Sequence, residues 1–124
     1  TALTDNEEKT DRAIAERNLL GFLGLCRRAG KVICGTPLIC RALAAREKPA
    51  LVLCSAEASA ATKKRLTTKC AFYQTPLCVL EVPLSRLAAA VGKTGSLAAV
   101  AVTDPGFAGA LEKKAAALSP SAPR

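Results

Sequence analysis

The sequence predicts an α/β protein, a three-layer α/β/α sandwich built as a single domain. Segments with helical spacing alternate with short apolar segments along the whole chain. The apolar run "ALVLC" (50–54) is typical of a strand that is covered on both faces. No linker or internal repeat divides the 124 residues, and a hydrophobic content of 50% is ample for one core.

The first expected element is a helix that ends at a glycine. Apolar residues recur at helical spacing from Asn18, and Gly30 supplies a C-terminal stop; the apolar positions are Leu19, Leu20, Phe22, Leu23 and Cys26. Residues 1–17 are polar and mixed in charge, so we expect a flexible extension that joins this helix between Thr10 and Asn18. The folded domain is expected over 18–116, and the tail 117–124 is expected to be disordered.

A short strand, a turn and a second helix are predicted next. The strand is "KVIC" (31–34) and the turn is at Gly35. Thr36 can then act as the N-cap of a helix that has Pro37 at its first position and runs to about Arg46. The buried side of this helix is expected to be formed by Ile39, Ala42 and Leu43.

The rest of the chain continues the alternation. After the central strand 50–54, Ser59 caps a helix to Tyr73 that turns Leu66 and Cys70 inward. A strand over 76–82 follows, and Pro83 opens a short helix. The last strand is expected at 96–102 and the last helix at 105–118.

Charge favours a polyanionic partner. The formal net charge is +8, from 18 Lys and Arg against 10 Asp and Glu, which suits RNA, DNA or an acidic membrane face. Aromatic residues make up only 3%, so a surface that stacks several bases on aromatic rings is disfavoured. No apolar stretch approaches the roughly 20 residues that span a bilayer, so we expect a cytoplasmic protein that does not use a membrane.

Neither a metal site nor a catalytic site is predicted. The six cysteines are never closer than six residues apart and histidine is absent, which favours reduced thiols without metal or other cofactor. The segment "VGKTGS" ends like a phosphate-binding loop, but Leu87 stands where that loop needs its first glycine. A plain helix stop is the better interpretation, and we expect no enzymatic activity.

Basic residues gather at the ends of predicted elements. Arg27, Arg28 and Lys31 flank Gly30, and the exposed N–H groups of the Gly35–Thr36 helix start favour a phosphate. Arg41 lies one turn further, on the side away from the apolar positions. Each residue alone has an ordinary structural explanation, but their clustering indicates an anion-binding site.

The order of motifs resembles the short bacterial members of the ribosomal protein L7Ae/L30e family. The resemblance covers about Asn18 to Leu111, through "GLCRRAGKVICGTPLICRAL", "LVLCSAEASAATKKRL", "TPLCVLEVPLSRLAAAVGK" and "AVAVTDPGFA". It implies a four-stranded mixed sheet within the three-layer fold. It also implies non-catalytic binding of kink-turn or related internal-loop RNA, linked to the ribosome or to RNA processing and transcription.

The resemblance also implies site residues. Gly35 and Thr36 match the family's glycine-led turn, Arg41 stands where a lysine commonly contacts RNA, and Lys31 and Arg28 border the turn. Glu57 replaces the acidic residue of the "AEDAS"-like loop, and Ala88 replaces the glycine of the "LGxA" loop, in which Ala90 matches. We expect the Gly30 corner, the Gly35–Thr36 helix start and the loop 87–91 to converge. The expected RNA-binding residues are Arg28, Lys31, Gly35, Thr36, Arg41, Glu57, Ala88, Ala89 and Ala90.

Two classes of function stay open. Kink-turn binders carry asparagine and glutamate after the threonine, where this chain has Pro37 and Leu38, so polar base contacts are lost there. The first hypothesis is a monomer that binds structured RNA, ribosomal RNA among the candidates, together with ribonucleoprotein proteins. The alternative is a protein-interaction module that uses an apolar patch of Pro37, Leu38 and Cys40.

Overall fold

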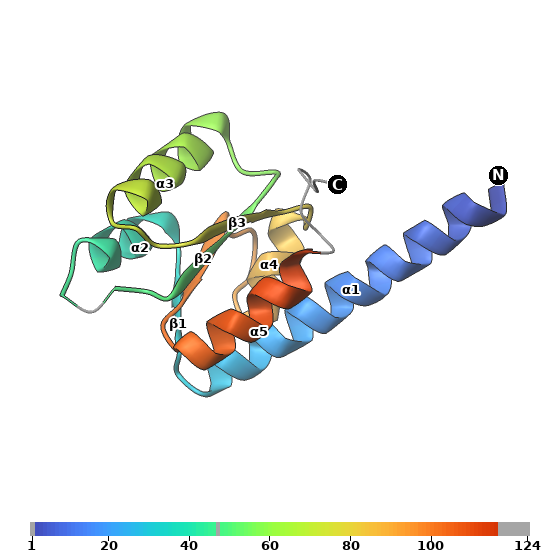
Figure 1. Cartoon of the computed structure of the whole chain (residues 1–124), viewed down its shortest axis with the longest axis horizontal. Helices are drawn as coiled ribbons and strands as arrows, with labels where there is room; N and C mark the ends of the chain where they lie inside the picture. The colour runs from blue at the N-terminus through green and yellow to red at the C-terminus, as the bar shows by residue number, and fades with distance from the viewer. Residues whose placement is uncertain (1, 47, 117–124) are drawn as a thin grey trace.

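Four strands form one sheet between two layers of helices (Figure 1). The computed structural model of the chain describes residues 2–46 and 48–116, with side chains from Arg12 onward. The elements, in chain order, are α1 (Ala2–Arg28), β1 (Val32–Cys34), α2 (Thr36–Leu43), β2 (Leu51–Ser55), α3 (Ala60–Phe72), β3 (Leu77–Leu80), α4 (Leu84–Ala90), β4 (Ala99–Val102) and α5 (Pro105–Ala115). The predicted three-layer α/β/α fold is confirmed.

The sheet is mixed, with the strand order β1-β4-β2-β3. β4 pairs antiparallel with both β1 and β2, whereas β2 and β3 pair in parallel. Val102 is the partner of Val32 on one side and of Leu51 on the other. The predicted central position of the strand "ALVLC" is therefore confirmed, since β2 has a neighbour on each side.

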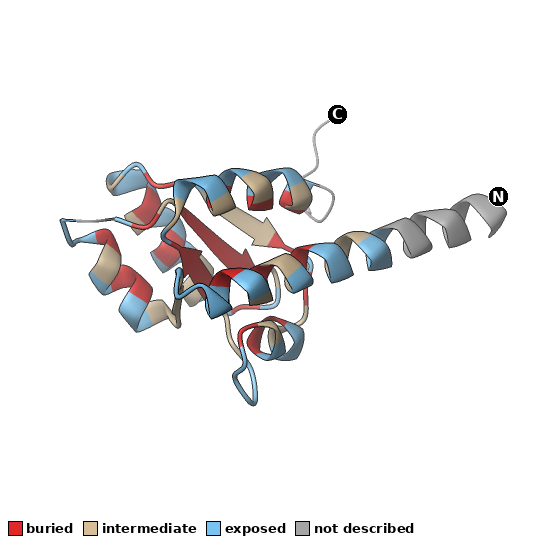
Figure 2. Ribbon diagram, turned by 90° about the horizontal axis from the view of Figure 1, so that it is seen from below, coloured by how far each residue is buried: buried red, intermediate tan, exposed pale blue. Residues whose placement is uncertain are grey.

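Each face of the sheet supports its own core. Leu51, Leu53, Val100 and Val102 pack with the helices α1, α4 and α5. The alternate residues of the same two strands pack with α2 and α3 on the other face; they are Val52, Cys54, Ala99 and Ala101. Figure 2 shows these central strands as fully buried. Side chains that alternate along a strand must be apolar on both faces when both faces are covered, which explains the unbroken apolar runs.

Helix α1 is longer than expected. It begins at Ala2, whereas the sequence predicts a helix that starts between Thr10 and Asn18. The segment is rich in alanine, glutamate, lysine and arginine, which favour helix even where no apolar periodicity is present. Arg12 donates to Glu81 at 2.6 Å and Arg86 donates to Glu16, so ion pairs join this part of α1 to the residues after β3 and to α4. The expected tail 117–124 lies outside the described residues.

The predicted features of α3 agree with the structure. The Ser59 side chain accepts from the Thr62 N–H and so caps α3, as predicted, and Leu66 and Cys70 are buried. All six cysteines are free thiols. In the described part of the chain, no helix combines the length and apolar character that a bilayer span requires.

Candidate functional site

One edge of the sheet gathers the loops that carry the candidate residues. Since β1 and β2 both run antiparallel to β4, and β3 runs parallel to β2, three strands end at the edge where β4 begins. Gly35 follows β1 there, Glu57 follows β2, and α4 begins after β3. Backbone hydrogen bonds join these loops, because Gly35 donates to Ala99 and Ser55 donates to Ala98. We call this the Gly35 edge.

The N-terminus of α2 at this edge has open backbone donors. Gly35, and not Thr36 as predicted, is the N-cap, and Thr36 is the first helical residue. Gly35 has a φ of 94°, a conformation that glycine adopts without strain, and its carbonyl oxygen accepts from the Ile39 N–H at 3.0 Å. No side chain caps the helix, and its first turn holds no acidic residue. The N–H groups at this end can therefore donate to an anion.

Two exposed cations that are not among the expected RNA-binding residues, Arg27 and Lys93, act electrostatically on Cys34, the residue before Gly35. Burial raises the pKa of the Cys34 thiol, and the positive charges of Lys93 and Arg27 oppose this rise. These two positive charges thus act on the thiol of the residue that precedes Gly35. The guanidinium group of Arg27 also covers Gly92, next to Lys93, so the end of α1 and the loop after α4 meet. Arg27 belongs to the basic cluster that the sequence places around Gly30, although it is not one of the expected RNA-binding residues. Lys93 follows a helix-ending glycine, which is an ordinary sequence feature and did not indicate the site.

Arg41 completes the basic surface along α2. Its side chain is exposed, whereas Ile39 and Leu43 on the same helix are buried, as predicted. Arg41 lies five residues after Thr36, or about 7.5 Å along the helix axis. The helix start and three exposed cations, Arg27, Lys93 and Arg41, are thus assembled from three separate segments.

The predicted residue Lys31 lies at the other end of β1, and Arg28 is an exposed residue in the last turn of α1. The Lys31 carbonyl accepts from the Thr103 N–H at 2.9 Å, which puts the Gly30 corner beside the end of β4. Gly35 is beside the beginning of β4, so the length of β1, about 13 Å between Lys31 and Gly35, separates the two turns. Lys31 therefore lies at the opposite end of β1 from the helix start, because a strand carries its two ends to opposite edges of the sheet.

Glu57 is held at the Gly35 edge by two contacts. The buried Ser55 hydroxyl accepts from the Glu57 N–H at 3.0 Å and donates to the Val82 carbonyl at 2.6 Å. A carboxylate oxygen of Glu57 accepts from the Leu84 N–H at 3.2 Å. Because the N-cap of α4, Pro83, makes no side-chain cap, Glu57 caps that helix from a different loop. Its side chain is exposed, and its second oxygen faces no partner among the described residues.

The alanine segment of α4 is only partly available. Ala88 is 0% exposed and packs in the interior, so its methyl group cannot contact a ligand as expected. Ala89 is exposed and Ala90 is partly exposed. The Ala90 carbonyl lies close to Gly24 of α1, so these two small residues border the seam between α1 and α4.

The alternative apolar patch loses one member. Cys40 is buried in the core between α2, α3 and the sheet, with Ile39 and Leu43, because it lies on the inward face of α2. Pro37 and Leu38 remain exposed, and Leu38 is 50% exposed. Two residues at the start of one helix form a small apolar surface.

The chemistry of the Gly35 edge is that of anion binding. Its groups are N–H donors, two guanidinium groups and an ammonium group, which match phosphate oxygens in geometry and charge. Within residues 2–46 and 48–116 no group of three His, Cys, Asp or Glu residues is arranged to hold a metal ion. The edge can thus hold an extended polyanion by several contacts.

Comparisons with known proteins agree with the resemblance seen in the sequence. The model of the ribosomal protein L7Ae/L30e/S12e/Gadd45 family matches residues 17–112. The RNA-binding protein YlxQ of Bacillus subtilis (strain 168) is 41% identical over 91 residues, which cover 73% of this chain and 87% of YlxQ.

Two solved structures have a similar fold. A protein of unknown function from Bacillus halodurans superposes with a TM-score of 0.71 at 32% identity, over 77% of this chain and 94% of that chain. The 15.5kD RNA binding protein of Giardia lamblia superposes with a TM-score of 0.67 over 81% of this chain and 89% of that one. Its identity of 16% makes this a likeness of fold.

Proposed function

This chain belongs to the ribosomal protein L7Ae/L30e/S12e/Gadd45 family, and on this basis we propose that it binds structured RNA at the Gly35 edge without catalysing a reaction. The preferred ligand is a kink-turn or a related internal loop. The observation that carries the proposal is the uncapped N-terminus of α2, with the exposed Arg41 further along the same helix. The name of YlxQ as an RNA-binding protein supports the same class of ligand.

The RNA backbone supplies most of the binding free energy in this proposal. The Thr36 and Leu38 N–H groups donate to a phosphate, and the guanidinium groups of Arg27 and Arg41 neutralise neighbouring phosphates. Pro37 has no N–H group, so it removes one donor and fixes the first turn of α2. Phosphate contacts fix the position of the RNA but carry little sequence information.

Recognition of bases falls to fewer groups. The free oxygen of Glu57 can accept from an exposed base, and Ala89 and Ala90 offer a small surface on which an unstacked base can lie. Pro37 and Leu38 present no side-chain hydrogen bond, so we propose that the protein recognises the shape of an internal loop more than its sequence. Lys31 has at most a long-range electrostatic role, since it lies at the other edge of the sheet.

The setting that we propose is the cytoplasm of a bacterium. There the protein works as a monomer with ribosomal RNA or another structured RNA, on the ribosome or beside proteins of RNA processing or transcription. Its net charge of +8 increases the rate of encounter with any of these RNAs.

The test is a comparison of two charge reversals on two RNAs. We expect Arg41→Glu to weaken binding to a kink-turn RNA by about tenfold or more, because one phosphate contact is lost and a repulsion is added. Lys113→Glu on α5 is the matched control, since Lys113 is exposed and lies outside the Gly35 edge. A fully paired duplex of the same length measures non-specific attraction. Two results would show diffuse charge attraction and refute the proposal. One is an equal loss of RNA affinity in Arg41→Glu and Lys113→Glu, and the other is an equal affinity of the unmodified protein for the kink-turn RNA and the duplex.

A further inference from the structure

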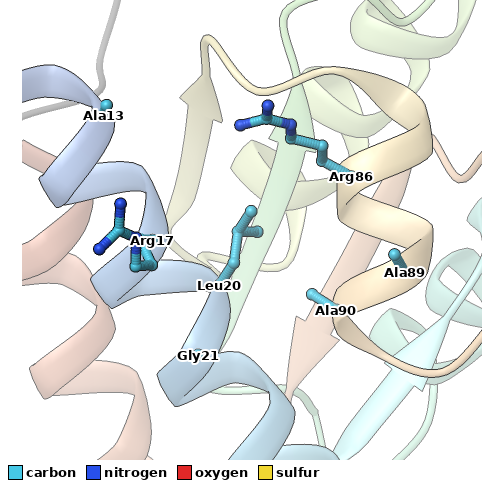
Figure 3. Close-up of a pocket in the computed structure, with 7 residues that line it drawn as sticks. All are labelled: Ala13, Arg17, Leu20, Gly21, Arg86, Ala89 and Ala90. Atoms are coloured by element: carbon cyan, nitrogen blue, oxygen red, sulfur yellow. The ribbon is translucent and has the colours of Figure 1, made fainter.

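A groove between α1 and α4 is a second candidate binding surface. It has a volume of about 630 Å³ and is lined by Ala13, Arg17, Leu20 and Gly21 of α1 and by Arg86, Ala89 and Ala90 of α4. Figure 3 shows Arg17 and Arg86 on opposite sides of the groove, with Leu20 between them. The groove thus combines an apolar floor with two cations at its rim.

Small side chains leave the groove open. A Cβ atom added at Gly21 would meet no atom within 4 Å, and alanines form the wall on the α4 side. Such a surface lets an extended ligand approach both α1 and α4 closely, whereas larger side chains would fill the space.

The two arginines keep hydrogen-bond donors available for a ligand. Arg86 donates through one nitrogen to Glu16, which holds its guanidinium group between the two helices, and its side chain stays 65% exposed. A guanidinium group has five N–H donors, so the remaining ones can bind an anion. Arg17 is exposed on the facing helix.

The seam between α1 and α4 continues from the groove towards Arg27 and Gly92. From Ala90 the seam between the helices passes Gly24, whose position is in contact with the Ala90 carbonyl, and then Arg27, which covers Gly92. Arg27 and Lys93 in turn lie near Cys34. Arg17 and Arg27 are ten residues apart, or about 15 Å along α1.

We infer that this groove binds the RNA strand that flanks the internal loop. Its arginines contact phosphates of that strand, and its apolar floor contacts the ribose side. This inference rests on the proposed function and extends the bound surface beyond the Gly35 edge. The two exposed arginines at the rim, Arg17 and Arg86, favour a polyanionic RNA strand as the occupant over a protein segment.

Three RNAs test the inference. One is the shortest kink-turn RNA that still folds, and the other two carry the same loop with a flanking single strand, one at the 5′ end and one at the 3′ end. We expect the unmodified protein to bind one of the extended RNAs about fivefold to tenfold more tightly, with a salt slope steeper by about 1.5.

Two variants localise the effect. Gly21→Leu fills the groove without changing the charge, and Arg17→Ala removes one cation. Both should abolish the preference for the extended RNA and leave the affinity for the short RNA unchanged. Gly109→Leu on α5 is the matched control, because an added Cβ at Gly109 also meets nothing within 4 Å. Circular dichroism verifies that all three variants fold.

Each failure has a distinct signature. If neither extension adds affinity, or if Gly21→Leu leaves the preference intact while Arg41→Glu weakens both RNAs, the groove does not bind the flanking strand and the proposed function stands. If the unmodified protein binds no kink-turn RNA, the proposed function fails and this inference fails with it.

Discussion

The guanidinium group of Arg27 lies against Gly92, so that a Cβ atom at Gly92 would be 2.8 Å from the Arg27 Cζ. Gly92 has a φ of 75°, in the left-handed region that favours glycine. The contact joins the last turn of α1 to the loop after α4 and keeps a cation at the Gly35 edge. Glycine at this position thus adopts a backbone conformation that other residues adopt only with strain, and it leaves the space that the Arg27 guanidinium group occupies.

We predict that Gly92→Ala displaces Arg27 and weakens RNA binding severalfold. The left-handed conformation adds a loss of stability of about 1–2 kcal/mol. Gly95→Ala is the matched control, since Gly95 has a φ of 82° but no atom within 4 Å of an added Cβ. Both variants should lose similar stability in thermal melts, and only Gly92→Ala should lose affinity. An equal loss of affinity in the two variants would show that Arg27 has no part in binding.

Lys93 tests whether the loop after α4 belongs to the site. We predict that Lys93→Ala weakens RNA binding and lowers the salt slope by about one, as expected for the loss of one phosphate contact. Lys64→Ala, at an exposed position of α3, should change neither quantity. A salt slope unchanged in Lys93→Ala would remove this residue from the interface.

Glu57 has a structural role, capping α4, that can be tested separately from its proposed role in RNA recognition. Glu57→Ala removes the acceptor for the Leu84 N–H and should lower the free energy of unfolding by about 1 kcal/mol, as the loss of an N-cap does. Glu57→Gln keeps an acceptor oxygen and should retain most of the stability. Urea unfolding of both variants measures this, and identical stability of Glu57→Ala and the unmodified protein would contradict the capping role.

Buried thiols predict a loss of stability at alkaline pH. Burial is the main cause that raises the pKa of Cys70 from 9.0 to about 11, and the neighbouring Cys40 and Cys54 add to it. The folded state disfavours the Cys70 thiolate. The stability that comes from keeping this thiol protonated is therefore complete below pH 9 and is lost as the pH rises from 9 towards 11. We expect the free energy of unfolding of Cys70→Ala to fall less steeply over this range than that of the unmodified protein. Parallel pH profiles would contradict the account.

The cysteines also remain predicted to be reduced and free of metal. We expect slow reaction with a thiol reagent in the folded protein and six reactive thiols after denaturation without a reductant, because unfolding removes the burial. Stoichiometric zinc in protein purified without added metal would contradict this.

Local sequence signals were sufficient for most of the fold. The cap at Ser59, the inward positions Leu66 and Cys70 and the doubly covered strand β2 depend on neighbours in the chain or on simple periodicity. The long helix α1 was not predictable from apolar spacing, because its first half depends on helix propensity and on pairs such as Arg12 with Glu81.

The candidate site was only partly predictable, because it is assembled from distant segments. Gly35 and Arg41 follow from the turn and from one helix face. The prediction that Ala88 contacts RNA is wrong, because three consecutive alanines in a sequence do not reveal which one faces the core. Arg27 and Lys93 depend on how α1 packs beside the loop after α4, and Lys31 depends on the direction of β1, which only the assembled sheet determines.

The most direct test of RNA binding at the Gly35 edge is a titration of the isotopically labelled protein with kink-turn RNA, followed by NMR at each backbone amide. Direct donation to phosphates predicts the largest shift changes at Thr36 and Leu38, together with changes at Gly92 and Lys93, and small changes along α5. Changes that are largest in Pro105–Ala115, or that are absent at saturating RNA, would contradict the account.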